Sequence, residues 1–390
     1  MRVYWPTDQS FDEALIALQA SKVLPLFDDE VLEFANYLSK QWLQLRNQPE
    51  IVALGYWLRK TNITHMQLQF KQENPGSISV ARGTVFHIAP SNVDTIFVYS
   101  WLLSLFAGNR NIIRVSGKSQ DNVLLTTIIE ALDTGKFNSI AKQTILCTYN
   151  YDEGATEKIS DLCHTRVIWG GDSTIKAIRQ VPLTPLANEL VFPDRFSVAL
   201  LNSESMDDVD AIAKKFYNDA FWFDQMACSS PRLIFWLGNN IIAIEQFWNS
   251  LDNQIKREQY EFQSALQVTK LSTALHYATN KTIDRISVSP EFTRIQVTEL
   301  DIEQREQHCG AGLFLECHVQ SIEEVAARLA DKDQTLSYYG VSKEDLNMLV
   351  NAISNRAIDR IVPLGQALNF SNIWDGQQFI TSFTRKVVIL

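Results

Sequence analysis

The sequence has fewer basic than acidic residues. Its 390 residues include 35 lysines and arginines against 45 aspartates and glutamates, which gives a formal net charge of −10 and a pI near 5.2. Because an acidic surface repels phosphate backbones, we expect no nucleic-acid partner. A basic pocket inside an acidic protein is still compatible with a nucleotide cofactor.

Cysteine pairs and histidine clusters are also missing. The five cysteines are odd in number and include no Cys-x-x-Cys pair, and the six histidines form no His-Glu-x-x-His motif. These absences argue against a disulfide framework and against a structural zinc. We therefore expect no metal site.

No apolar run is long enough to span a membrane. The most apolar stretch, Ile96 to Ala107, has 12 residues, whereas a spanning helix needs about 20. The opening segment MRVYWPTDQSFDEAL has no apolar core of the kind found in signal peptides. We expect no integral membrane segment and a location in the reducing cytoplasm.

The patterns that are present indicate an α/β protein. Apolar residues at three-to-four spacing predict helices in the first 70 or so residues. From about Val80 to Gln180, short β-type runs alternate with helical stretches, which is typical of βαβ units with a parallel sheet. Prolines 182, 185 and 193 interrupt the next stretch, and we expect a domain boundary there.

Two segments carry residue types suited to acyl chemistry. Cys228 in DQMACSSPR lies between a predicted helix and a predicted strand, where loops often carry reactive groups, although a free cysteine commonly packs as a small apolar side chain. Asn92 in HIAPSN follows a predicted strand, where its amide could donate to an oxyanion or simply form a turn or helix cap. The residues alone leave both interpretations open.

Two other segments carry residue types suited to phosphate binding. In WGGDST, Gly170 and Gly171 join a predicted strand to a helix that begins near Ser173. Such a turn lets a phosphate approach backbone N–H groups, but an ordinary βα turn has the same appearance. Arg114 ends another predicted strand, with Ser116 just behind it. A guanidinium there could bind a phosphate or simply point into solvent.

Taken in order, these segments resemble a known family. HIAPSN, an apolar helix and GNRNIIR are similar to the aldehyde dehydrogenase pattern of strand, Pro-Trp-Asn, helix, Gly-Asn and strand. Over about Val80 to Leu390 the chain resembles the LuxC-type acyl-CoA reductases (fatty-acid reductases) of the aldehyde dehydrogenase superfamily. The segments that carry this second resemblance are VIWGGDSTIKAIR, VFPDRFSVALL, FWFDQMACSSPR, QTLSYYG, DRIVPLGQALNFSNIWDG and FTRKVVIL.

The resemblance implies an aldehyde dehydrogenase-like fold. Residues 1–188 would form a helical N-terminal part and a parallel-sheet, Rossmann-type NADP-binding domain. Residues 189–370 would form an α/β catalytic domain with the nucleophilic cysteine, and residues 371–390 a tail for oligomerisation. The final strand, Arg385 to Leu390, could pair with a neighbouring subunit, so we expect a homo-oligomer.

The resemblance also implies catalytic roles. Cys228 would accept the acyl group, and Asn92 would form an oxyanion hole with the backbone N–H of Cys228. Glu189 would be a loose counterpart of the general base of hydrolytic aldehyde dehydrogenases. Gln225 departs from the superfamily pattern, because it lies three residues before the cysteine where many aldehyde dehydrogenases have it two before.

For the cofactor, the resemblance implies NADPH. Gly170, Gly171 and Ser173 would line its pyrophosphate. Arg114 stands where the superfamily usually has a lysine near the adenosine ribose, with Ser116 close by. An arginine there suits a 2′-phosphate, which favours NADPH over NADH.

The implied reaction is the NADPH-dependent reduction of an acyl thioester to an aldehyde through an acyl-cysteine intermediate. The acyl donor would be coenzyme A, a carrier protein or an acyl-protein synthetase. Three alternatives stay open: an NAD(P)-dependent aldehyde dehydrogenase working toward the acid, a cofactor-free cysteine acyltransferase or thioesterase, and a non-catalytic subunit that scaffolds an acyl-activating partner.

Overall fold

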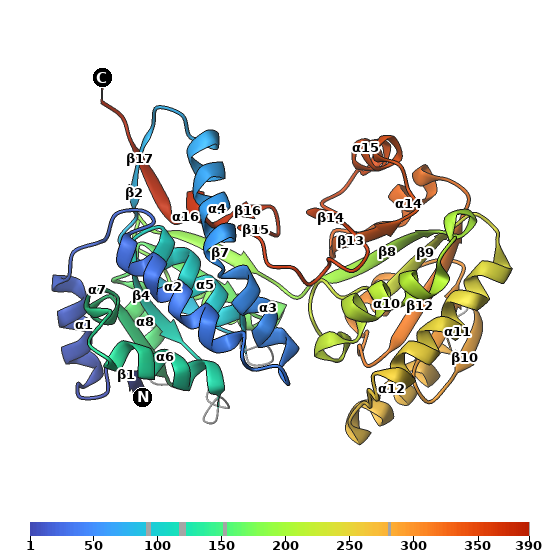
Figure 1. The fold of residues 1–390 in the computed structure, drawn as a ribbon, viewed down its shortest axis with the longest axis horizontal. Coiled ribbons are helices and arrows are strands. Elements are labelled where there is room, and N and C mark those ends of the chain that lie inside the picture. Colours follow the sequence, from blue (N-terminus) through green and yellow to red (C-terminus); the bar gives the residue numbers. More distant parts are fainter. Residues whose placement is uncertain (91–94, 117–121, 151–153, 280–281, 390) are drawn as a thin grey trace. The chain divides into compact units, whose positions relative to one another are not determined.

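The computed structural model describes residues 1–390 except 91–94, 117–121, 151–153, 280–281 and 390. The chain divides into two compact units (Figure 1). The first contains Met1–Asp194 and Phe370–Leu390, and the second contains Arg195–Asn369. Each unit is built on its own sheet.

The sheet of the first unit has six strands in the order β1–β5–β4–β3–β6–β7. Strands β3 to β7 are parallel, and β1 runs antiparallel to β5. The helical interpretation of the first 70 or so residues is wrong for β1, because Arg2 and Val3 pair with Thr148 and Cys147. The strands are β1 Arg2–Trp5, β3 Thr84–Ile88, β4 Arg110–Arg114, β5 Thr144–Thr148, β6 Thr165–Trp169 and β7 Asn188–Phe192.

Helices cover both faces of this sheet because successive strand side chains point to opposite faces. Val85 and Val167 belong to one apolar core, and their neighbours Phe86 and Ile168 belong to another. The first core includes α2 (Asp29–Trp42), α3 (Pro49–Trp57), α4 (Lys60–Glu73), α5 (Thr95–Phe106) and α6 (Val123–Asp133). The second includes α1 (Phe11–Ala20), α8 (Ala155–Ser160) and α9 (Asp172–Ile178).

The sheet of the second unit has seven strands in the order β10–β11–β12–β9–β8–β13–β14, and only β10 is antiparallel to its neighbour. Helices α10 (Val209–Ala220) and α11 (Ile241–Arg257) cover one face. Helices α12 (Ser264–Tyr277), α14 (Ile322–Arg328) and α15 (Lys343–Ala352) cover the other. The strands are β8 Phe196–Asn202, β9 Leu233–Leu237, β10 Ile283–Val288, β11 Thr293–Val297, β12 Leu313–Val319, β13 Asp333–Tyr339 and β14 Arg360–Pro363.

The last segment of the chain returns to the first unit. Beyond the short strands β15 (Ile373–Trp374) and β16 (Gln377–Gln378), helix α16 (Phe379–Ser382) and strand β17 (Thr384–Val387) follow. β17 pairs antiparallel with β2 (Ile78–Ala81), so the red C-terminal strand lies beside a blue N-terminal one in Figure 1. The expected C-terminal strand therefore forms, and its partner belongs to the same chain.

The boundary between the two units lies at 194/195, six residues after the expected 188/189. The reason is that β7 belongs to the first sheet, as its edge strand, and not to the second unit. Residues 371–390, expected as a separate tail, belong to that first unit as well. Parallel sheets covered by helices on both faces confirm the α/β class.

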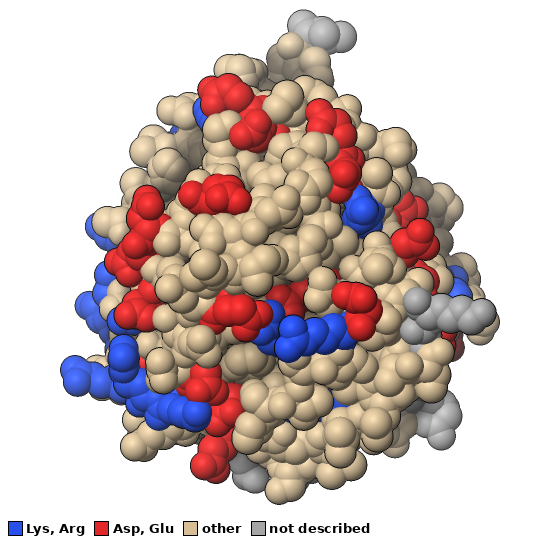
Figure 2. All heavy atoms as spheres, turned by 90° about the vertical axis from the view of Figure 1, so that its right-hand side faces the viewer, with Lys and Arg blue, Asp and Glu red and all other residues tan. Residues whose placement is uncertain are grey.

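Among the described residues, no helix combines the length and apolar character needed to cross a bilayer. On the face shown in Figure 2, acidic and basic side chains are interspersed with broad uncharged areas.

Candidate active site

Cys228 lies in a turn that leads into the sheet of the second unit. The turn follows α10 and a 3-10 segment, η3 (Trp222–Gln225), and ends where β9 begins at Leu233. Cys228 is partly exposed, whereas the two serines after it are buried. The turn therefore places a partly exposed cysteine shortly before the amino end of a buried strand.

The backbone just before this turn is strained. Phe223, Asp224 and Gln225 have φ values of 57°, 54° and 62°, so three consecutive non-glycine residues occupy the left-handed region. Each such residue costs about 1–3 kcal/mol and persists only where its surroundings enforce it, which happens often at functional sites. The sequence FWFDQMAC gives little indication of this conformation, because only Asp224 among the three is of a residue type that is enriched in the left-handed region.

The other cysteines are less suited to nucleophilic attack. Burial raises the pKa of Cys147 and of Cys163 to about 12. Burial also raises the pKa of Cys309 and of Cys317 above the usual thiol value. Since the thiolate is the nucleophile, burial makes these four thiols less suited to nucleophilic attack.

The expected cofactor residues lie at the end of the first sheet where its parallel strands terminate. The order β5–β4–β3–β6–β7 places β3 and β6 side by side, while the chain leaves β3 toward β4 on the other side. A crevice at such a topological switch point, outside the carboxyl ends of the strands, is where open α/β sheets bind nucleotides. Gly170 and Gly171 directly follow β6 at this edge.

The glycine turn has room for a ligand at one residue and close packing at the other. A Cβ on Gly170 would lie 3.2 Å from Cγ2 of Thr174, whereas a Cβ on Gly171 would meet nothing within 4 Å. Gly171 caps α9, and Ser173 is exposed in its first turn. The turn thus keeps strand and helix close and leaves the helix N-terminus accessible.

Asn92 lies outside the described residues.

Arg114 ends β4 at the same carboxyl edge, and Ser116 follows two residues later. The Arg114 Nη2 donates to the carbonyl oxygen of Tyr149 at 3.2 Å, and its guanidinium lies 5.1 Å from the centre of the Tyr149 ring. These contacts fix a cation beside the strands that border the switch point.

Glu189 lies at the opposite end of the first sheet, where its parallel strands begin. It lies near the amino end of β7 and accepts hydrogen bonds from Arg166 at 2.6 Å and from Arg179 at 2.7 Å. Each carboxylate oxygen therefore has an arginine partner. This geometry gives no support to the expected role of Glu189 as a general base.

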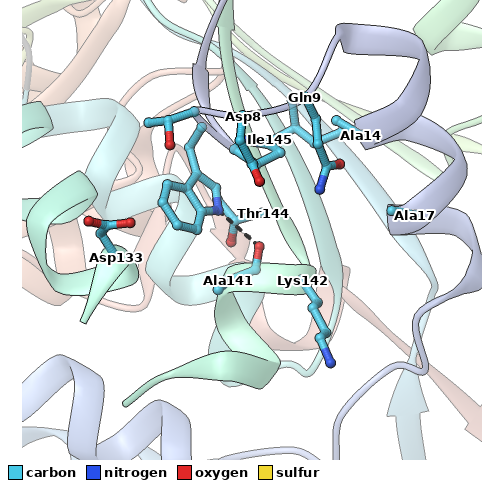
Figure 3. Close-up of a pocket in the computed structure, with 12 residues that line it drawn as sticks. Asp8, Gln9, Ala14, Ala17, Asp133, Ala141, Lys142, Thr144 and Ile145 are labelled. Carbon is cyan, nitrogen blue, oxygen red and sulfur yellow. Dashed lines mark hydrogen bonds between the residues drawn. The ribbon is translucent and has the colours of Figure 1, made fainter. Parts of the chain in front are cut away.

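A cavity of about 370 Å³ opens at that same amino edge, where β5 begins at Thr144. Figure 3 shows Asp8 and Gln9 on one side of it and Lys142 on another. Dinucleotides bind at the carboxyl edge of such sheets, so this cavity is separate from the expected cofactor edge. Among the described residues, no group of three or more His, Cys, Asp or Glu side chains could bind a metal ion.

One contact that positions Cys228 in the second unit was not predicted from the sequence. Ser197, near the start of β8, donates from Oγ to the carbonyl oxygen of Cys228 at 2.6 Å. No motif marks Ser197, since an alternating strand such as FSVALL predicts only which side chains share a face. The contact is visible only once β8 and β9 are paired.

Curated relatives share a single description. The chain is 27% identical over 180 residues to a long-chain acyl-protein thioester reductase from Aliivibrio fischeri, covering 45% of this chain and 36% of that one. It is 23% identical over 308 residues to a reductase of the same name from Photorhabdus laumondii subsp. laumondii, covering 73% and 58%. The chain thus spans little more than a third of the length of the first relative.

Solved structures share the fold. Glyceraldehyde-3-phosphate dehydrogenase GapN from Methanocaldococcus jannaschii, complexed with NADP, is similar with a TM-score of 0.69 and 12% identity over 96% of this chain and 92% of that one. A Thermus 1-pyrroline-5-carboxylate dehydrogenase with bound NAD has a TM-score of 0.66 and 14% identity over 97% and 85%. Both similarities confirm the aldehyde dehydrogenase-like fold. The LuxC acyl-CoA reductase family matches residues 62–386, most of the chain, and the protein therefore belongs to that family.

Proposed function

We propose that this protein reduces an acyl thioester to an aldehyde, with Cys228 as the acyl-accepting nucleophile and NADPH as the reductant. The observation that carries the proposal is the Cys228 turn. Cys228 is partly exposed there, shortly after three residues with a strained backbone and shortly before β9 begins, in a chain that matches the LuxC family over residues 62–386.

We propose that residues at the switch point bind the dinucleotide. Gly170, Gly171 and Ser173 would hold the pyrophosphate at the beginning of α9, where backbone N–H groups and the helix dipole favour negative charge. Arg114 and Ser116 would hold the adenosine end, and the guanidinium would pair with a 2′-phosphate. The bound cofactor would supply the hydride.

The protein's own groups would perform the acyl transfer. The thiolate of Cys228 forms a bond to the acyl carbon, and the donor thiol departs as the tetrahedral oxyanion collapses. Asn92 and the backbone N–H of Cys228 would donate to that oxyanion, and losing one such donor typically costs about 3–4 kcal/mol of barrier. The acyl-cysteine must then be kept from water until it is reduced.

The geometry of Glu189 favours reduction over oxidation to an acid. Hydrolysis of an acyl-cysteine needs a base that activates water, whereas both oxygens of Glu189 accept hydrogen bonds from arginines. Since both oxygens of Glu189 are bonded to arginines, the base that the resemblance implies is engaged elsewhere, and this supports reduction over hydrolysis.

We also propose an acyl donor, a protein partner and an oligomeric state. The curated relatives are named for long-chain acyl-protein thioesters, so we propose an acyl group delivered on a protein thiol, with acyl-CoA as the other candidate donor. An acyl carrier protein or an acyl-protein synthetase would then be the partner. We further propose a homo-oligomer in the cytoplasm.

The test is NADPH oxidation, followed by the loss of near-ultraviolet absorbance. Wild type and Cys228→Ala would be assayed with long-chain acyl-CoA and with an acylated carrier protein, and the products analysed for aldehyde. We expect thioester-dependent oxidation by the wild type alone, and weaker activity with NADH. In parallel assays, the substitution Arg114→Ala should lower the preference for NADPH over NADH.

Two results would contradict the proposal. Oxidation that persists in Cys228→Ala would remove the nucleophile. A wild type that hydrolyses the thioester at the same rate with and without NADPH would identify a thioesterase instead.

A further inference from the structure

The side chain of Gln225, the residue just before the Cys228 turn, connects the beginning of that turn to its end. Gln225 is fully buried, and its Nε2 donates to the carbonyl oxygens of Pro231 at 2.9 Å and of Leu313 at 3.1 Å. Its Oε1 accepts from the backbone N–H of Gly312 at 2.9 Å. One amide therefore closes the loop from 225 to 231 and anchors it to the segment that enters β12.

Neighbouring backbone contacts strengthen this anchor. The N–H of Ala311 donates to the carbonyl oxygen of Asp224 at 2.9 Å. Gly310 has a φ of +67°, and a Cβ there would lie 2.7 Å from Sδ of Met226. The segment before β12 thus packs directly against the strained residues that precede Cys228.

Ser197 fixes the turn from the other side. Its Oγ donates to the carbonyl oxygen of Cys228 at 2.6 Å and accepts from the N–H of Thr335 on β13 at 3.3 Å. Ser197 is fully buried. The backbone of Cys228 is therefore bonded to β8, while Gln225 bonds the same turn to β12.

We infer that Gln225 and Ser197 are positioning residues that hold the Cys228 turn in its reactive geometry, an inference that rests on the proposed role of Cys228. Three left-handed residues in a row do not persist without external contacts, and the Gln225 amide supplies three of them. An error of about 1 Å in the position of a reacting group can cost about 100-fold in rate.

The test uses substitutions that remove these bonds with little change of volume. Gln225→Glu places an oxygen against the two carbonyls that Nε2 now serves, and Gln225→Met keeps the length without polar atoms. Ser197→Ala removes only the hydroxyl. The matched controls are Gln304→Glu, which alters a buried glutamine bonded to Thr282 and Asp301, and Ser39→Ala, which alters a buried serine bonded to Gly55.

Each variant would be measured in three ways: the midpoint of urea unfolding, the pH profile of Cys228 alkylation by iodoacetamide, and kcat and KM with an acyl thioester. We expect the Gln225 and Ser197 variants to change the alkylation profile and to lower kcat by about 10- to 100-fold, with KM changed less than twofold. The controls should change only the unfolding midpoint.

The outcomes separate this inference from the proposed function. Variants that unfold more easily but keep the wild-type alkylation profile and kcat would reduce both residues to structural roles. If Gln225→Glu fails to fold, Gln225→Met and Ser197→Ala decide the matter. A wild type without reductase activity, whose variants still show altered alkylation, would overturn the reductase proposal and leave the positioning role intact.

Discussion

Burial sets Cys147 and Cys163 apart from Cys228, which is partly exposed. Cys147 and Cys163 are buried, with pKa values raised to about 12, so almost none of either thiol is ionised at pH 8. We expect iodoacetamide at that pH to label Cys228 first in the folded protein and to leave Cys147 and Cys163 unlabelled. Peptide mass spectrometry would check this, and equal labelling of Cys147 and Cys228 would contradict it.

A buried carboxyl group makes the stability of the second unit depend on pH. Asp219 accepts hydrogen bonds from the N–H groups of Gly365 and Ala367, yet burial raises its pKa from 3.8 to about 7. Between these values the native state keeps a proton that the unfolded state has released. The free energy of unfolding should therefore fall as pH rises through this range.

The change at Asp219 is measured by urea unfolding at pH 5 and pH 8. In Asp219→Asn the decrease with rising pH should be smaller by up to about 1.4 kcal/mol per pH unit, the value for one proton. The exposed residue Asp284 in the same unit supplies the matched control variant, Asp284→Asn. An identical pH dependence in wild type and Asp219→Asn would show that this carboxyl does not titrate in the range.

At the scale of single elements, helix α1 depends on a capping box. Ser10 accepts from the N–H of Glu13, while the Glu13 carboxylate accepts from the N–H of Ser10. The helix then packs Leu15 and Leu18 against the first sheet. Ser10→Ala should lower the free energy of unfolding by about 0.5–2 kcal/mol.

The cap of α15 supplies the matched comparison. Ser342 accepts from the N–H of Asp345 in the second unit, so Ser342→Ala should cost a similar free energy there. Hydrogen exchange would locate each effect. Protection lost in α1 after Ser342→Ala, or in α15 after Ser10→Ala, would contradict the assignment of these helices to separate units.

The elements also show how far the sequence leads. Alternating apolar runs predict β3 to β6 with their helices, because period and length are local properties. The four-residue strand β1 is missed, since its identity comes from pairing with β5 more than 140 positions away. The same holds at the site: DQMACSSPR marks Cys228, but Ser197 and Gln225 make their contacts across 31 and 88 positions.

At the scale of the whole molecule, the C-terminal segment completes the core of the first unit. Phe379 and Phe383 are fully buried there, and Phe379 stacks on Trp169 and Phe192. Phe383→Ala should lower the free energy of unfolding by about 3–5 kcal/mol. Denaturant unfolding would measure the loss, and an effect below 1 kcal/mol would contradict the packing described.

The second unit, in contrast, is one continuous stretch with its own sheet and two cores. We expect residues 195–369, produced alone, to fold with a cooperative thermal transition and a defined near-ultraviolet circular dichroism spectrum. A product that binds a hydrophobic dye and lacks that spectrum would show that the unit needs the remainder of the chain.

The return of the last segment to the first unit fixes an order of events during synthesis. A ribosome finishes residues 195–369 before it makes Phe379 and Phe383, which the first unit needs for its core. The part of the protein translated first is therefore the last that can be completed. Until then, its unfilled core leaves apolar surface exposed, which is the condition under which nascent chains aggregate.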